Sequence, residues 1–313
     1  MLDDVVKTYD LRGLVGSQLT PEIMVALGTA FAKFVSADRL IIGHDMRPSS
    51  PEFAESFAQG VNNFGKGVVL LGLCSTDQTY FASGTLNLPA VMFTASHNPA
   101  SYNGIKFSNA GATGISFETG LSEIKKLAES FIDKPLPRKE RNVENYDSLL
   151  DYAEYLKSLV QIPENSLRVV VDAANGMGGH TVPAVLSDLE IDEMYFDLDG
   201  TFPNHEANPL EPKNLVDLQN RVLETKADLG IAFDGDADRC FIVDELAKPV
   251  NPSAIASIVA KREVQRVGGS PYVLHNLLTS RYFQEYLQEM GAKTVRTKVG
   301  HSLIKDEMRR TNA

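Results

Sequence analysis

The sequence predicts an α/β protein of tandem three-layer α/β/α domains with mixed, mostly parallel sheets. Short apolar runs alternate with segments of helical period along almost the whole chain. Most of these runs are continuously apolar, as expected for strands that helices cover on both faces of a parallel sheet. The alternation of strands and helices is interrupted and resumes twice along the chain, near residues 141 and 249. We therefore expect three domains, at residues 1–140, 141–248 and 249–313, of which the third is incomplete.

The first domain carries the clearest alternation of strands and helices. We assign strands to residues 39–43, 68–71, 89–94 and 104–108, and helices to residues 51–63, 77–87 and 119–132. Residues 133–145 are charged, contain two prolines and have almost no apolar side chains. This composition is typical of a connecting segment, so we interpret these residues as a linker.

The alternation resumes after the linker and continues to the end of the chain. In the second domain we expect a helix at residues 146–160 and strands at 167–172, 192–197, 228–233 and 240–243. In the third we expect helices at residues 252–265, 280–290 and from about 302, with strands at 272–274 and 293–297. Few strands are available to this third block, which is why we expect it to be incomplete.

The composition argues against a nucleic-acid-binding protein, a membrane protein and a disulfide-rich secreted protein. The chain has 313 residues, 43% of them hydrophobic, and a formal net charge of −11. Such a charge argues against nucleic acid or an anionic membrane as a partner. Two cysteines are too few for a disulfide framework, and neither a signal peptide nor an apolar stretch long enough to cross a bilayer is evident. We expect a soluble cytoplasmic protein, either a monomer or a dimer.

One candidate site follows the strand expected at residues 89–94. The segment reads TASHNP and presents Ser96 and His97 where that strand ends. Ligands of open α/β sheets gather at the carboxyl ends of strands, so Ser96 is a candidate nucleophile. Serine, asparagine and proline are also ordinary turn residues, and the segment lacks the glycines of a serine-hydrolase elbow. On this motif alone, an ordinary turn is the simpler interpretation.

A second candidate site lies in LGIAFDGDADRCFIV, residues 229–243. Asp234, Asp236 and Asp238 alternate along an extended segment, so their carboxylates can converge, and hard oxygen ligands of this kind suit Mg²⁺ or Ca²⁺. An EF-hand loop would have glycine at its sixth position, where this chain has Arg239. We favour a Mg²⁺ site at a strand end. The alternative is a solvated acidic turn.

Cationic side chains accompany the two motifs. Arg12 lies in what we interpret as a glycine-containing turn, and Lys106 comes ten residues after Ser96. Lys298 and His301 flank an expected helix N-terminus, which is a natural anion site. A hydroxyl, a metal triad and several cations together indicate phosphoryl transfer, although each cation alone is more typical of an ordinary surface charge.

Four motifs together resemble the α-D-phosphohexomutase family, specifically its phosphomannomutase/phosphoglucomutase branch. They are YDLRG at residues 9–13, TASHNP at 94–99, DGDADR at 234–239 and KVGHSLIK at 298–305, in the family's order. The segments FPNH and NPL, at residues 202–205 and 208–210, are also similar to that branch. The pairing of TASHNP with DGDADR is highly specific.

The resemblance implies an activity and a metal site. Ser96 would carry a phosphoryl group, and one of its phosphate oxygens would join the three aspartates in holding Mg²⁺. The phosphoryl group would pass to a hexose 1-phosphate, of mannose or glucose. The resulting 1,6-bisphosphate would turn around in the site and return its other phosphate to Ser96, leaving the 6-phosphate. Glucose 1,6-bisphosphate is then expected to serve as activator and intermediate.

The resemblance also implies roles for the remaining candidates. Lys106 would be the general acid and base for the sugar hydroxyl. Arg12 and Arg239 would stabilise the phosphoserine and the transferring group. The expected ligand contacts come from the following residues: His97, which would position the loop or the sugar, Tyr9, which would line the cleft, and Lys298 and His301, which would bind substrate.

The family's substrate clamp is not found in this sequence. A sugar-reading segment of the third domain and the phosphate-gripping loop of a fourth domain do not occur before Ala313. We therefore expect a shortened mutase with impaired activity. Two other functions stay open, namely a Mg²⁺-dependent sugar-phosphate phosphatase and a binding protein without catalysis.

Overall fold

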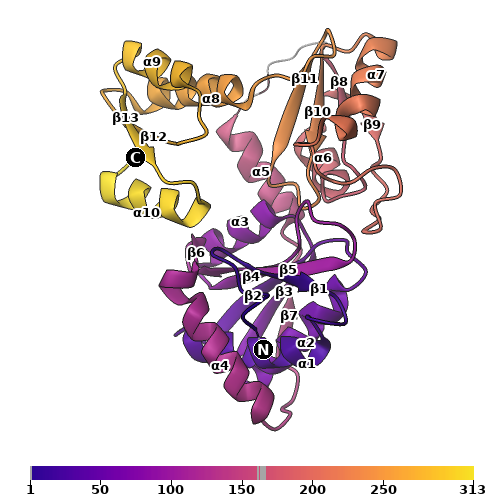
Figure 1. Cartoon of the computed structure of the whole chain (residues 1–313), viewed down its shortest axis with the longest axis vertical. Helices are drawn as coiled ribbons and strands as arrows, with labels where there is room; N and C mark the ends of the chain where they lie inside the picture. Colours follow the sequence, from indigo (N-terminus) through magenta and orange to yellow (C-terminus); the bar gives the residue numbers. More distant parts are fainter. Residues whose placement is uncertain (1, 161, 163–166) are drawn as a thin grey trace. The chain divides into compact units, whose positions relative to one another are not determined.

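A computed structural model describes residues 2–160, 162 and 167–313 (Figure 1). The chain divides into two compact units, the first ending at Ala247 and the second comprising Lys248–Ala313. The first unit contains two separate sheets and the second unit contains one. A further division near residue 140 remains a prediction, as does the exact boundary at residue 248.

The first sheet is mixed. Its strands are β1 (Leu11–Leu14), β2 (Arg39–His44), β3 (Gly67–Leu73), β4 (Ala90–Phe93), β5 (Tyr102–Asn109) and β7 (Val143–Asn145), in the order β1-β5-β4-β2-β3-β7, with the short β6 (Thr113–Gly114) paired to β5. Strands β4, β2, β3 and β7 run parallel. Strand β5 is antiparallel to both β4 and β1. The connection from β4 to β5 therefore turns back sharply at the carboxyl end of β4, and this turn carries Ser96.

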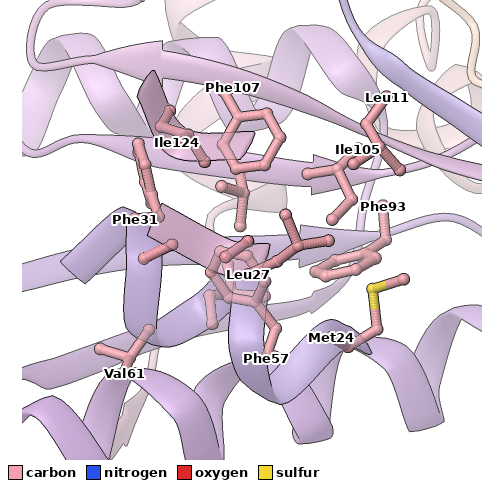
Figure 2. Close-up of a cluster of buried hydrophobic side chains, with 14 of the residues drawn as sticks. Leu11, Met24, Leu27, Phe31, Phe57, Val61, Phe93, Ile105, Phe107 and Ile124 are labelled. Carbon is pink, nitrogen blue, oxygen red and sulfur yellow. The ribbon is translucent and has the colours of Figure 1, made fainter. Parts of the chain in front are cut away.

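Helices cover both faces of this sheet. Helices α1 (Pro21–Phe34), α2 (Ser50–Phe64) and α4 (Ser122–Asp133) pack on one face, and α3 (Thr76–Leu86) packs on the other. Helix α1 begins with Thr20 as its cap and Pro21 in its first turn, a common start signal. Phe31 of α1 and Phe57 of α2 pack against Phe107 of β5 and Phe93 of β4 (Figure 2), with ring centroids 5.1 Å apart for Phe31 and Phe107 and 5.5 Å for Phe57 and Phe93. This core fixes the sheet from which the serine loop projects.

Two sequence-based assignments in this region were wrong. Residues Val143–Asn145, assigned to the linker, form β7 and pair with β3. This edge strand is short and mostly polar, so its pairing depends on backbone hydrogen bonds and leaves no apolar pattern. Arg12 lies in strand β1 rather than in a turn, because Leu11–Leu14 pair with residues 102–105 of β5, far away in the sequence.

The second sheet places the acidic motif. Its strands are β8 (Arg168–Asp172), β9 (Glu190–Met194), β10 (Leu229–Phe233) and β11 (Cys240–Asp244), in the order β11-β10-β8-β9. Strand β8 is parallel to β9 and β10, and β11 is antiparallel to β10. Helix α7 (Val216–Thr225) packs on one face and α6 (Gly178–Val185) on the other. The strand expected at residues 192–197 begins and ends earlier, as β9.

Helix α5 (Leu149–Leu159) lies between the two sheets of the first unit and contacts α3 and α6. The second unit has two parallel strands, β12 (Tyr272–Asn276) and β13 (Lys293–Thr297), with helices α8 (Pro252–Val267), α9 (Arg281–Glu289) and α10 (His301–Thr311). Its core includes Val264, Phe283 and Leu287. Among the residues that the structure describes, none of the helices is both long and apolar enough to cross a bilayer.

Candidate active site

Ser96 lies on the loop between β4 and β5 in a left-handed backbone conformation, with φ at 49°. Its side chain is almost completely buried, and its backbone N–H donates to Thr94 Oγ1 at 2.8 Å. The Ser96 hydroxyl donates to Asp234 Oδ2 at 2.7 Å. A predicted nucleophile on the first sheet and a predicted metal ligand on the second are therefore in direct contact.

The acidic motif forms the tight turn between β10 and β11. One carboxylate oxygen from each of Asp234, Asp236 and Asp238 lies within 4.8 Å of the others. Asp234 and Asp236 are completely buried. The hydroxyl of Thr76, at the start of α3, donates to Asp236 Oδ2 at 2.5 Å, and the Thr76 backbone N–H donates to the Asp236 carbonyl at 3.2 Å. The convergence of the three carboxylates is confirmed. The expectation of an extended segment was wrong, because residues 234–239 form a turn in which Ala237 has a left-handed φ of 57° and its N–H donates to the Asp234 carbonyl at 3.0 Å.

Burial and mutual repulsion make this cluster costly to ionise. Desolvation, together with the charges of Asp236 and Asp238, raises the pKa of Asp234 to about 8. Burial also opposes ionisation of Asp236, but the neighbouring Lys106 outweighs it and lowers the pKa of that carboxyl. The site therefore needs positive charge among its carboxylates.

Lys106 supplies one such charge. It lies on β5, opposite Met92 of β4, and its Nζ is 2.6 Å from both Asp236 Oδ2 and Asp238 Oδ2. Burial would lower the pKa of Lys106, but the two carboxylates outweigh burial and raise it. In this arrangement the ammonium group is strongly held in its protonated form.

Arg239 connects the acidic turn to the serine loop. Its Nη2 donates to Asp234 Oδ2 at 2.5 Å and to the hydroxyl oxygen of Ser96. The same nitrogen lies 2.6 Å from His97 Nδ1. Because a guanidinium only donates, Nδ1 is the acceptor and the neutral imidazole carries its proton on Nε2. Burial and the charges of Arg239 and Arg12 lower the pKa of His97 to about 4, in agreement with a neutral ring.

Among the described side chains, the other predicted site residues are not part of the cluster formed by Ser96 and the three aspartates. Arg12 does not contact the Ser96 hydroxyl; it donates to Asn98 Oδ1 on the serine loop and pairs with Asp10 at 2.6 Å. Tyr9 is 38% exposed on the segment that leads into β1. Lys298 is exposed after β13 and His301 begins α10, both in the second unit, and the His301 side chain lies outside the described residues. The roles of these residues remain predictions.

The donor set fits a hard divalent cation. Three carboxylates converge on one point, and Asp236 Oδ1 is buried with no hydrogen-bond partner among the described residues. Oxygen ligands of this type and number suit Mg²⁺. An EF-hand is excluded because the turn is flanked by strands β10 and β11, and Glu245, its would-be twelfth residue, is not part of the cluster.

Three residues close to this cluster were not identified from the sequence. Arg47 binds backbone carbonyls of the serine loop, Thr76 binds Asp236, and Asn98 binds Arg12. Arg47 and Thr76 both come within three residues after the end of a parallel strand, β2 and β3 respectively. The rule that drew attention to Ser96, at the end of β4, applies equally to these two neighbouring strands.

Comparisons with known proteins agree with the geometry. Three family models, described as phosphoglucomutase/phosphomannomutase, alpha/beta/alpha domains I, II and III, match residues 3–131, 150–247 and 251–313 in that order. A phosphomannomutase from Vibrio cholerae is 34% identical over 98% of this chain, and the match covers 69% of that protein. A phosphoglucomutase from Neisseria meningitidis is 33% identical over 99% of this chain and 68% of its own length.

A solved structure agrees as well. The crystal structure of a phosphoglucomutase/phosphomannomutase family protein from Burkholderia thailandensis superimposes with a TM-score of 0.91 at 29% identity, over 100% of this chain and 70% of that one. The resemblance inferred from the four motifs is confirmed, and the chain belongs to the phosphoglucomutase/phosphomannomutase family.

Proposed function

We propose that this chain interconverts hexose 1-phosphate and hexose 6-phosphate by passing a phosphoryl group through Ser96. The hexose is mannose, glucose or both, and the intermediate is the 1,6-bisphosphate. The observation that carries the proposal is the contact of the Ser96 hydroxyl with Asp234 and Arg239, inside a cluster of three carboxylates. Family membership supports the same reaction.

Each side chain at the cluster has a task in this scheme. Ser96 accepts the phosphoryl group, and Arg239, whose Nη2 already contacts the hydroxyl oxygen, neutralises the charge that the phosphate brings. His97 is neutral and accepts a hydrogen bond from Arg239, so its task is to orient that guanidinium. Arg12 acts on the loop through Asn98. Phosphoryl transfer depends mainly on this kind of positioning and charge neutralisation.

Asp234, Asp236 and Asp238 would hold Mg²⁺. When bound there, Mg²⁺ would neutralise part of the negative charge that develops on the transferring phosphoryl group. Lys106 holds a proton while it contacts Asp236 and Asp238, so it can donate to the oxygen that leaves the phosphorus. To accept a proton from a sugar hydroxyl it must first be neutral, which requires another cation to compensate those two carboxylates.

Substrate recognition is assigned to residues outside the cluster. We propose that Tyr9 lines the cleft and that Lys298 and His301, in the second unit, bind the phosphate or the sugar. Glucose 1,6-bisphosphate would act as the phosphoryl donor that loads Ser96. A crystal structure of an N-acetylphosphoglucosamine mutase variant from Aspergillus fumigatus, described as a complex with glucose 1,6-bisphosphate, makes this sugar bisphosphate a reasonable probe.

The test is to incubate the purified chain with Mg²⁺ and glucose 1,6-bisphosphate and to map phosphate by peptide mass spectrometry. We expect one phosphate on Ser96. Excess mannose 1-phosphate or glucose 1-phosphate should remove this phosphate as the 1,6-bisphosphate, and the 6-phosphate should appear as the bisphosphate returns its other phosphate to Ser96. Ser96→Ala should abolish labelling. Ser101→Ala, which removes an exposed hydroxyl from the same loop, should leave labelling unchanged.

Other outcomes would contradict the proposal and identify the alternative. Release of inorganic phosphate without any isomerised sugar would indicate a phosphatase. Binding of hexose phosphate by a folded chain that never labels Ser96 would indicate a binding protein without catalysis.

A further inference from the structure

Arg47 is completely buried, although it lies in a loop immediately after β2. Its Nη1 donates to the carbonyls of Pro99 at 2.8 Å and Tyr102 at 3.0 Å. Its Nη2 donates to the carbonyls of Ser96 at 2.9 Å and Asn98 at 2.7 Å. One guanidinium therefore holds four carbonyl groups of the segment that carries the nucleophile.

The Nη groups of this guanidinium are fully used by the loop, and its Nε, which makes no hydrogen bond among the described residues, is buried away from solvent. Its four Nη hydrogens are directed at the four loop carbonyls, and Nε lies 3.3 Å from Asp45 Oδ2 in a fully buried ion pair. An arginine that binds substrate phosphate needs donors that point into the site. Arg47 cannot do this while the loop is in place. Its position indicates a role in the shape of the loop.

The loop requires such support at Ser96. A non-glycine residue at a φ of 49° is in a sparsely populated conformation, and such strain persists only when the surrounding structure imposes it. The Ser96 carbonyl is held by Arg47 on one side. On the other side lies Gly235, where an added Cβ would be 2.5 Å from that same oxygen. The direction of the Ser96 side chain follows from the placement of this carbonyl.

Phe202, in the loop that follows β9 of the second sheet, also contacts the Arg47 guanidinium. The ring of Phe202 lies against the guanidinium, with Arg47 Cζ 5.1 Å from the ring centroid. The loop that carries Phe202 also passes very close to Arg47, since an added Cβ on Gly200 would be 2.5 Å from Arg47 Cα. The aromatic face can hold the planar guanidinium in the orientation that serves all four carbonyls.

We propose that Arg47 is the positioning residue of the nucleophile: its guanidinium fixes residues 96–102 so that the Ser96 hydroxyl meets Asp234 and Arg239, and Phe202 holds that guanidinium in place. This inference rests on the proposed function for its catalytic consequence. The fixing of the loop is independent of any activity. Because Phe202 comes from outside the first sheet, the nucleophile is correctly placed only when both sheets of the unit are packed together.

The experiment compares Arg47→Lys and Phe202→Leu with the wild type. Lysine keeps the charge beside Asp45 but cannot serve four carbonyls in one plane. Displacement of the loop by about 1 Å is expected to slow loading of Ser96 from glucose 1,6-bisphosphate about 100-fold. The KM for hexose phosphate should stay nearly constant. Arg39→Lys is the matched control, because Arg39 starts β2, the strand that precedes the Arg47 loop, and forms an exposed ion pair with Glu144; this variant should load like the wild type.

Two further readouts separate this proposal from the proposed function. Amide hydrogen exchange of residues 94–102 should become faster in Arg47→Lys, whereas the affinity for Mg²⁺, measured by calorimetry, should not change because the three aspartates are untouched. If the wild type never loads Ser96, the proposed function fails, while the exchange measurement still tests the fixing of the loop. Should Arg47→Lys not fold, Phe202→Leu provides the same comparison, since its ring is only partly buried. Unchanged exchange and unchanged loading in the folded variants would overturn the proposal.

Discussion

Replacement of Gly235 by alanine tests how tightly the acidic turn and the serine loop must fit. The added Cβ would be 2.5 Å from the Ser96 carbonyl oxygen, a distance that real Cβ contacts do not show. The two backbones must separate by about 0.5 Å to restore 3.0 Å and by about 0.9 Å to reach ordinary contact at 3.4 Å. No side-chain rotation can relieve the clash, because the neighbour is a main-chain atom.

The magnitude follows from this displacement. Overpacking of this kind destabilises by about 1–3 kcal/mol. A shift of nearly 1 Å in the Ser96 carbonyl also disturbs its bond to Arg47 and the approach of its hydroxyl to Asp234, so loading of Ser96 should slow about 100-fold. The two effects are measured separately, by urea unfolding and by time-resolved mass spectrometry of the Ser96 phosphate.

The matched control is Gly84→Ala. Gly84 lies exposed within α3, and an added Cβ there would meet no atom within 4 Å. Alanine at this position should stabilise the chain by about 0.5–1 kcal/mol and leave loading unchanged. If Gly235→Ala unfolds at the same urea concentration as the wild type and loads Ser96 at the same rate, the reasoning about the close approach of the two loops is refuted.

Three further predictions test other parts of the structure. Thr76→Val removes the hydroxyl that donates to Asp236 and should weaken Mg²⁺ binding about 10- to 100-fold by calorimetry; an unchanged affinity would show that this hydrogen bond does not support the site. Burial alone would lower the pKa of His205, but its hydrogen bond to Asp172 and the charge of Asp172 raise it. The stabilisation by this pair is therefore fully present below pH 6.5 and is lost as the pH rises through the raised pKa. The free energy of unfolding lost in His205→Gln should accordingly be larger at acidic than at alkaline pH, and a pH-independent loss would contradict the assignment. Phe57→Ala, in the aromatic core, should cost about 3–5 kcal/mol in urea unfolding, and a loss below about 1 kcal/mol would mean that the core can close around the gap.

Local patterns predicted the chemical groups of the site because these patterns are short. The spacing of Asp234, Asp236 and Asp238 indicated a shared carboxylate site, but their convergence depends on the turn between β10 and β11, because residues 234–239 are not extended. Ser96 was found because it follows a strongly apolar strand. Lys106 was noted because it follows Ser96 by ten residues, within the strand expected at residues 104–108, and the structure adds its contacts with Asp236 and Asp238.

The features that were missed depend on partners distant in the sequence. Strand β1 exists because it pairs with β5, and β7 because it pairs with β3. Neither short segment carries an apolar alternation that would reveal it. The buried state of Arg47 depends on carbonyl groups about fifty residues further along the chain, and on Phe202 from another part of the unit. A charged side chain with such partners looks in the sequence like any surface arginine.

The hydrogen bond from Ser96 to Asp234 joins groups that belong to different sheets, and this has a consequence for folding. A chain in which only one sheet has formed would have either a hydroxyl without its acidic neighbours or acidic neighbours without a hydroxyl. The ability of Ser96 to accept phosphate would then arise in a single late step, when the two sheets of the first unit pack together. In a refolding experiment, the capacity to accept phosphate should lag behind the recovery of secondary structure, and the length of the lag would measure the rate of docking.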